Sequence, residues 1–80
     1  MKVLTVFGKY QYGDPSREIG PEYASFIPAL IGLGHDVVHF ESWDRRCYSN
    51  YADLNQALLA TVEREQPDIM LVVQLNYEIW

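Results

Sequence analysis

Residues suited to binding a small polar ligand are concentrated in the segment GKYQYGDPSR, residues 8–17. Lys9 and Arg17 can hold a carboxylate or a phosphate. Tyr10 can stack on a sugar ring or a flat heterocycle while its hydroxyl forms a hydrogen bond. A second polar group, QLNYE, follows the last apolar run of the chain. The candidate binding residues are Gly8, Lys9, Tyr10, Arg17, Gln74, Asn76 and Glu78.

Signatures of phosphate loops and of metal sites are missing from this segment and its neighbours. Gly8 and Gly13 have the spacing of neither GxGxxG nor GxxxxGK[ST], and an acid and a proline follow Gly13. His35 and His39 are four residues apart, but one falls in a turn and the other in a strand, so they cannot share a face as metal ligands. The sequence therefore predicts neither a metal site nor a bound cofactor.

Three apolar runs predict the strands that must position these residues. Continuous apolar character is typical of parallel strands that are covered on both faces, and it predicts strands over Lys2–Phe7, Asp36–Glu41 and 68–75. The polar His39 inside the second run indicates tolerance of solvent and therefore an edge strand.

Two amphipathic segments predict the helices between the strands. The first helix begins with Pro21 and ends near Gly34, which suits a left-handed cap. The second has an N-terminal cap at Ser49 or Asn50 and stops at Pro67. The predicted apolar stripe of the first helix is Tyr23, Phe26, Ile27, Leu30, Ile31 and Leu33; that of the second is Leu54, Ala57, Leu58, Thr61 and Val62.

The alternation of strands and helices predicts an α/β fold. Two right-handed crossovers give a Rossmann-like three-layer parallel sheet, β-α-β-α-β, with the strand order 2-1-3. The sheet is incomplete, because its third strand has an open side. Ligands of such sheets bind at the carboxyl ends of the strands where the winding reverses, here between strands one and three. Both groups of candidate residues leave their strands at that point, so we expect them to converge.

Composition limits the partners of the chain. The 80 residues include eleven acidic residues against six Lys and Arg, with a formal net charge of -5, so nucleic acid and anionic membrane are not expected as partners. The N-terminal apolar run is too short for a signal peptide or a membrane span, which makes the cytoplasm the default location. The single cysteine, Cys47, has no histidine near it in sequence and is expected to be inert.

Three stretches of the chain resemble a known enzyme family. VFGKYQYGDPSR, PALIGLGHDVVHF and EREQPDIMLVV with NYEI are similar to the N-terminal half-domain of GT-B glycosyltransferases, particularly the family of the CgeB spore maturation protein. The resemblance implies that residues 1–80 are part of an acceptor-binding domain, with a missing C-terminal domain that binds the nucleotide-sugar donor. It places Lys9, Tyr10 and Arg17 nearest the acceptor substrate or sugar. The 80-residue chain alone is not expected to be an active transferase.

Two alternatives stay open at this stage. One is a small flavodoxin-like binding module that dimerises with a second copy of the chain through its third strand and holds a small molecule at the same edge. The other is an inactive remnant without a ligand. The residues leave the donor sugar, the acceptor and the inverting or retaining outcome open.

Overall fold

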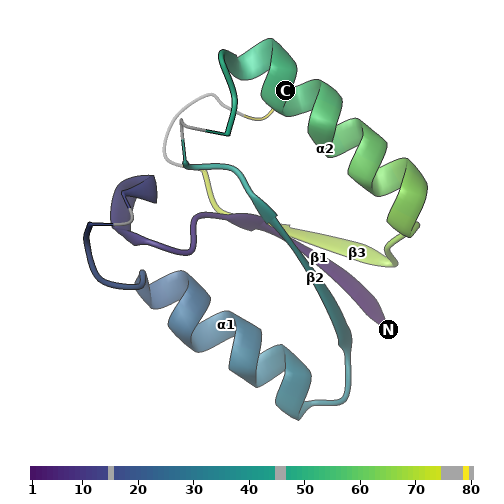
Figure 1. Cartoon of the computed structure of the whole chain (residues 1–80). Coiled ribbons are helices and arrows are strands. Elements are labelled where there is room, and N and C mark those ends of the chain that lie inside the picture. The colour runs from purple at the N-terminus through teal and green to yellow at the C-terminus, as the bar shows by residue number, and fades with distance from the viewer. Residues whose placement is uncertain (15, 45–46, 75–78, 80) are drawn as a thin grey trace.

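The computed structural model describes residues 1–14, 16–44, 47–74 and 79. Its elements are β1 (Lys2–Phe7), the short 3-10 helix η1 (Gln11–Gly13), α1 (Pro21–Gly32), β2 (Asp36–Glu41), α2 (Tyr51–Glu65) and β3 (Ile69–Val72). The strands form one parallel sheet in the order β2-β1-β3, with α1 and α2 on opposite faces (Figure 1). The predicted α/β class and strand order are confirmed.

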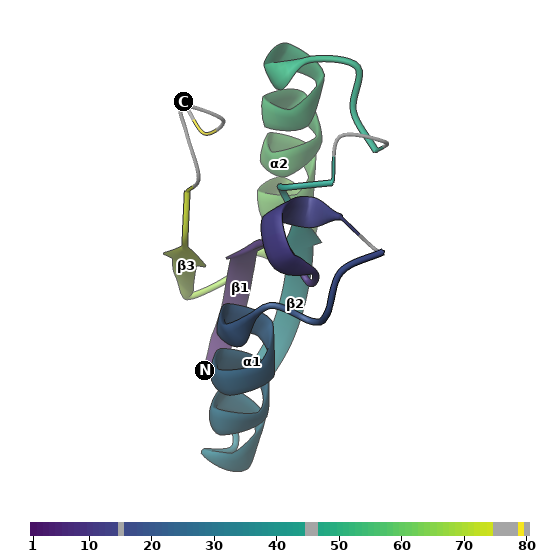
Figure 2. The same cartoon turned by 90° about the vertical axis from the view of Figure 1, so that its left-hand side faces the viewer.

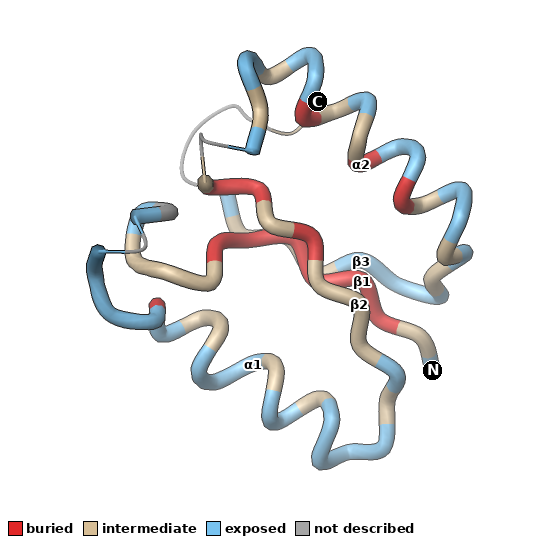
Figure 3. The backbone as a smooth tube through the Cα atoms, viewed as in Figure 1, coloured by how far each residue is buried: buried red, intermediate tan, exposed pale blue. Residues whose placement is uncertain are grey.

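The central strand β1 is the most buried element of the structure. Its residues 3–7 are almost completely shielded from solvent (Figure 3). Because successive side chains of a strand point to opposite faces, this continuous burial requires cover on both sides. Leu4 and Val6 pack with Phe40 and α2, whereas Phe7 contacts Phe26 of α1 at a ring distance of 6.1 Å. The apolar run of β1 thus reflects its place between two helices.

Helix α2 forms as its sequence predicts. The side chain of Asn50 caps it, because its Oδ1 accepts a hydrogen bond from the backbone N–H of Asp53 at 2.9 Å. Leu54 and Leu58 are buried against the sheet. The helix ends at Glu65 and is followed by a C-cap residue, Gln66, whose φ of 50° is left-handed.

Helix α1 buries less than the sequence predicts. None of its residues is fully buried, and Phe26, Ile31 and Leu33 of the predicted stripe are exposed. The row that lies against the sheet is narrower and contains Tyr23 and Ile27, which are half-buried. Phe26 contacts Phe7 at one edge of its ring and remains 39% exposed, whereas Ile31 and Leu33 are 59% and 74% exposed.

Strand β3 is shorter and more exposed than predicted. It covers four residues, and Ile69 and Met70 are 51% and 44% exposed. These neighbours point to opposite faces, so neither helix covers this part of the strand. Figure 2 shows the reason, because both helices stand over β1 and β2 while β3 lies to one side. The prediction that this strand is buried on both faces is therefore wrong over its first half; the predicted run also extends into 75, which lies outside the described residues.

The edge position of β2 is confirmed, but its histidine does not face solvent. The ring of His39 lies 5.0 Å from that of Phe7 and 5.1 Å from that of Tyr23, and its Nδ1 is 2.8 Å from the hydroxyl oxygen of Thr5. Burial lowers the pKa of His39, the carboxylate of Glu41 opposes this effect, and the charge of Lys9 adds to it. The polar residue that indicated an edge thus packs beneath α1.

Within the described parts of the chain, no helix is both long enough and apolar enough to cross a membrane.

Candidate functional site

The long connection after β1 folds back on itself. Its two limbs meet in an antiparallel bridge between Tyr10 and Ile19. The backbone N–H of Gln11 donates to the carbonyl oxygen of Glu18 at 3.0 Å, and the N–H of Gly20 donates to that of Lys9 at 2.8 Å. These bonds satisfy backbone groups that an open loop would leave to water. The connection is therefore a compact loop, here called the 8–20 loop, that stands at the carboxyl edge of the sheet.

The tip of the 8–20 loop is organised by Asp14. Its Oδ1 accepts hydrogen bonds from the hydroxyl and the backbone N–H of Ser16, at 2.7 and 3.0 Å. These two bonds, the hydroxyl first, lower the pKa of Asp14. Arg17 places its Nε 3.6 Å from the other carboxylate oxygen and its guanidinium carbon 5.3 Å from the centre of the Tyr12 ring. The charge of Arg17 is thus engaged within the loop.

Trp43 joins the ends of all three strands. Its indole N–H donates to the carbonyl oxygen of Val73, just after β3, at 3.1 Å. Its ring lies so close to Gly8, just after β1, that a Cβ there would meet Cε3 at 2.4 Å. Trp43 itself follows β2 and is only 7% exposed. These contacts fix the position of Trp43. Its indole forms the floor of the space at the carboxyl ends of β1 and β3, where the winding of the sheet reverses.

The carboxylate of Glu41, the last residue of β2, binds the backbone on both sides of the Gly8–Trp43 contact. Its Oε1 accepts a hydrogen bond from the backbone N–H of Lys9 at 2.9 Å. Its Oε2 accepts from the N–H groups of Trp43 and Asp44, at 3.0 and 3.3 Å. A charged acceptor strengthens each of these bonds. One side chain at the end of β2 thus fixes the start of the 8–20 loop and the residue that forms the floor.

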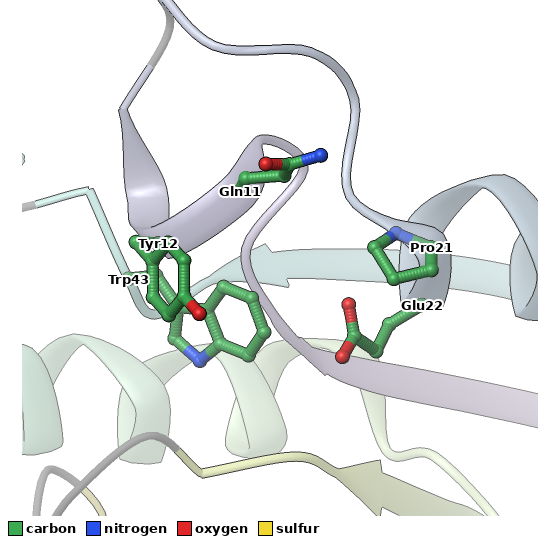
Figure 4. A pocket seen from close by; sticks show the side chains of 5 residues that line it. All are labelled: Gln11, Tyr12, Pro21, Glu22 and Trp43. Atoms are coloured by element: carbon green, nitrogen blue, oxygen red, sulfur yellow. The ribbon is translucent and has the colours of Figure 1, made fainter.

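A pocket of about 340 Å³ opens between the 8–20 loop and the start of α1. Figure 4 shows the Tyr12 ring beside the indole of Trp43, with the carboxylate of Glu22 directed toward the same space from α1. Among the described residues, neither the Glu22 carboxylate nor the Gln11 side-chain amide has a hydrogen-bond or ion-pair partner. The described residues that line the pocket are Gln11, Tyr12, Pro21, Glu22 and Trp43.

The candidate residues from the sequence that the structure describes, Gly8, Lys9, Tyr10, Arg17 and Gln74, are not among the residues that line the pocket. Gly8 packs against Trp43, and Gln74 is exposed immediately beyond β3. Lys9 directs its ammonium over the rings of Tyr10 and Tyr23, at 5.7 and 5.4 Å from their centres. Arg17 lies at the tip, as described above. Asn76 and Glu78 are outside the described residues, so the predicted convergence of the two groups stays a prediction.

None of the described lining residues is among the candidate binding residues from the sequence, although Gln11 and Tyr12 lie inside the segment 8–17 that the sequence indicates for ligand binding. Tyr12 and Trp43 lie in the connections that follow β1 and β2, and both residues line the pocket. Gln11 gave no signal, and Glu22 has the ordinary position of an acid in the first turn of a helix. Both reach the pocket only because the 8–20 loop folds back toward α1.

The arrangement can stack a ring and hydrogen-bond its substituents. Two aromatic faces supply apolar contact, an amide supplies a donor and an acceptor, and a carboxylate supplies acceptors. The described residues contain no group of three His, Cys, Asp or Glu side chains that could hold a metal ion. Comparisons with models of protein families, with curated proteins and with solved structures return no match for this chain.

Proposed function

We propose that the chain forms the acceptor-binding side of a glycosyltransferase of the GT-B type. In this proposal the pocket beside the 8–20 loop receives the acceptor, and a separate C-terminal domain binds the nucleotide-sugar donor. The observation that carries the proposal is that Tyr12 and Trp43 lie with Gln11 and Glu22, two polar side chains that find no partner among the described residues, at the carboxyl edge of a parallel sheet.

The chemistry of the pocket matches a sugar ring. A pyranose has an apolar face of C–H groups that packs on an aromatic ring, and hydroxyls around its rim that need donors and acceptors. Gln11 offers both kinds of group and Glu22 offers acceptors. A volume of about 340 Å³ lies at the small end of the range for ligand sites, which suits one sugar unit.

The same pocket is unsuited to the donor. A nucleoside diphosphate needs cations or a cluster of backbone N–H groups. The one charged side chain among the described lining residues is the carboxylate of Glu22, and the chain carries a net charge of -5. This contrast is the reason why the proposal assigns the acceptor side, and not the donor side, to this chain.

A titration followed by nuclear magnetic resonance tests the proposal. Glucose, galactose, glucosamine and uridine diphosphate are added separately to the ¹⁵N-labelled 80-residue chain. We expect at least one sugar to shift the indole N–H signal of Trp43 and the backbone signals of Gln11 and Tyr12, and uridine diphosphate to leave them unchanged. Tyr12→Ala should weaken the response, whereas Tyr12→Phe should retain it. The proposal fails if no sugar shifts these signals, or if uridine diphosphate shifts them more strongly.

A second candidate function rests on β3. Ile69 and Met70 are exposed on opposite faces of this strand. An apolar edge of this kind invites pairing with another strand. It favours the flavodoxin-like module that dimerises through β3, with the ligand held at the same carboxyl edge. The state of association distinguishes this candidate from the first, while an inactive remnant would show no response to any ligand.

A further inference from the structure

The aromatic side chains near the pocket already hold cations of the chain itself. The ammonium of Lys9 lies over the rings of Tyr10 and Tyr23, and the guanidinium of Arg17 lies over Tyr12. Such contacts form because the face of an aromatic ring carries negative electrostatic potential. This edge of the molecule is therefore rich in surfaces that attract positive charge.

The described residues that line the pocket include no positively charged side chain. Trp43 has the ring type that attracts cations most strongly, yet within the described part of the chain no cation lies over it. The carboxylate of Glu22 points into the same space, and the described residues provide it with neither a hydrogen bond nor an ion pair. The ammonium of Lys9 lies over Tyr10 and Tyr23, and the guanidinium of Arg17 is paired with Asp14. An acid and an indole thus face one small volume whose described lining residues include no cation.

We infer that the ligand of this pocket carries a protonated amine on a sugar-sized ring, as an amino sugar does. The inference rests on the proposed function, because it names the substrate class of the same pocket. The ring packs on Tyr12 and Trp43, its hydroxyls bond to Gln11, and its ammonium group lies between the carboxylate of Glu22 and the nearby aromatic surface.

Other ligand charges satisfy this arrangement less well. A neutral sugar can donate a hydroxyl to Glu22, but it removes water from the carboxylate without bringing an opposite charge. A sugar phosphate or a uronic acid brings a second negative charge toward Glu22 in a chain whose net charge is already -5. The ammonium group alone balances the charge of the acid and uses the aromatic faces.

The experiment compares three ligands that differ at one position. Glucosamine, glucose and N-acetylglucosamine share the ring, and only the first carries a positive charge. Each is titrated into the 80-residue chain, with the Trp43 indole signal as the readout. We expect glucosamine to bind about five- to tenfold more tightly than glucose, and added salt to reduce that preference.

Two variants connect the preference to its residue. Glu22→Gln keeps the shape of the side chain and should remove the preference for glucosamine. Glu18→Gln removes a charge from the same loop at an exposed position outside the pocket, and it should retain the preference. Glu22→Asp retains the charge and should keep part of the preference, which excludes misfolding as the cause.

The outcomes separate this inference from the proposed function. If glucose binds as tightly as glucosamine, or if Glu22→Gln leaves the preference unchanged, the assignment of an ammonium ligand is overturned while sugar binding stands. If none of the three sugars binds, both the inference and the acceptor-site proposal are overturned. Preferential binding of glucosamine that depends on Glu22 and on salt supports both.

Discussion

Gly8 and Trp43 are packed against each other so closely that the first must be glycine. A Cβ at position 8 would lie 2.4 Å from Cε3, 2.7 Å from Cδ2 and 2.8 Å from Cβ of the tryptophan. Because the indole N–H is also bound to the carbonyl oxygen of Val73, the ring cannot move aside without losing that bond. The contact joins the ends of β1 and β2 and supports the floor of the pocket.

Gly8→Ala is accordingly expected to destabilise the fold. Forcing one methyl group into a closely packed region costs about 1–3 kcal/mol, since side chains or backbone must shift. The free energy of unfolding, measured by urea denaturation, should fall by that amount, and the indole signal of Trp43 should move. Gly32→Ala is the matched control, because a Cβ there meets nothing within 4 Å and Gly32 lies in α1. Alanine favours a helix by about 0.5–1 kcal/mol over glycine, so this variant should be as stable as the parent or more so.

The second prediction concerns the three hydrogen bonds that Glu41 accepts. Glu41→Gln replaces one carboxylate oxygen by an NH₂ group, which cannot accept a hydrogen bond, so either the bond from the N–H of Lys9 or the bonds from the N–H groups of Trp43 and Asp44 are lost. Losing a charged acceptor of part-buried donors costs about 1–3 kcal/mol. Hydrogen exchange should be faster than in the parent chain at the amide of Lys9 or at that of Trp43, whichever loses its acceptor.

Glu63→Gln provides the control for this substitution. Glu63 is exposed on α2, so its replacement should leave both the stability and the exchange rates near those of the parent. Equal exchange at Lys9 and Trp43 in Glu41→Gln and in Glu63→Gln would show that Glu41 does not hold the loop.

The sequence predicted those parts of the fold that depend on local patterns. The bounds of β1 and β2, the start of α1 at Pro21 and the left-handed Gly34 with its φ of 88° were all readable from apolar runs and from turn residues. The strand order followed from placing the more apolar strands inward and the second strand, which contains the polar His39, at an edge. These features depend on a residue and its near neighbours along the chain.

The pocket was less readable, because it depends on contacts between distant segments. The 8–20 loop brings Gln11 and Tyr12 to face Glu22 and Trp43 only after its two limbs have paired through Tyr10 and Ile19. No periodicity records that pairing. The exposure of Ile69 and Met70 on both faces of β3 was not predicted for a related reason. An apolar run shows that a strand can be buried, but it does not show whether a helix covers that strand.

The third prediction is a pH dependence due to His39. Burial lowers its pKa below the ordinary value of 6.5, so the folded chain binds the proton less readily than the unfolded chain does. The stability that neutral His39 contributes is therefore fully present above pH 6.5, the pKa of the unfolded chain. It is lost as the pH falls from 6.5 through the lower pKa of the folded chain. The free energy of unfolding should decrease as the pH is lowered from about 7 to about 5.

His39→Gln should flatten this part of the profile, because glutamine does not titrate. Asp14→Asn is the matched control: the pKa of Asp14 is lowered, so its contribution changes at more acidic pH and the slope near neutrality should stay. A profile that is as steep in His39→Gln as in the parent would assign the pH dependence to another group.

The last prediction concerns the exposed strand β3. Because Ile69 and Met70 present apolar side chains on both faces of a strand at the sheet edge, we expect the chain to self-associate as its concentration rises. Ile69→Lys places a charge on that strand and should lower the weight-average mass in sedimentation equilibrium at a given concentration. Leu59→Lys is the control, since Leu59 is 58% exposed on α2, away from the strand, and should change the association little. A discrete dimer that Ile69→Lys dissociates favours the dimeric binding module, whereas a monomer at all concentrations removes the support for it and leaves the acceptor-side proposal in place.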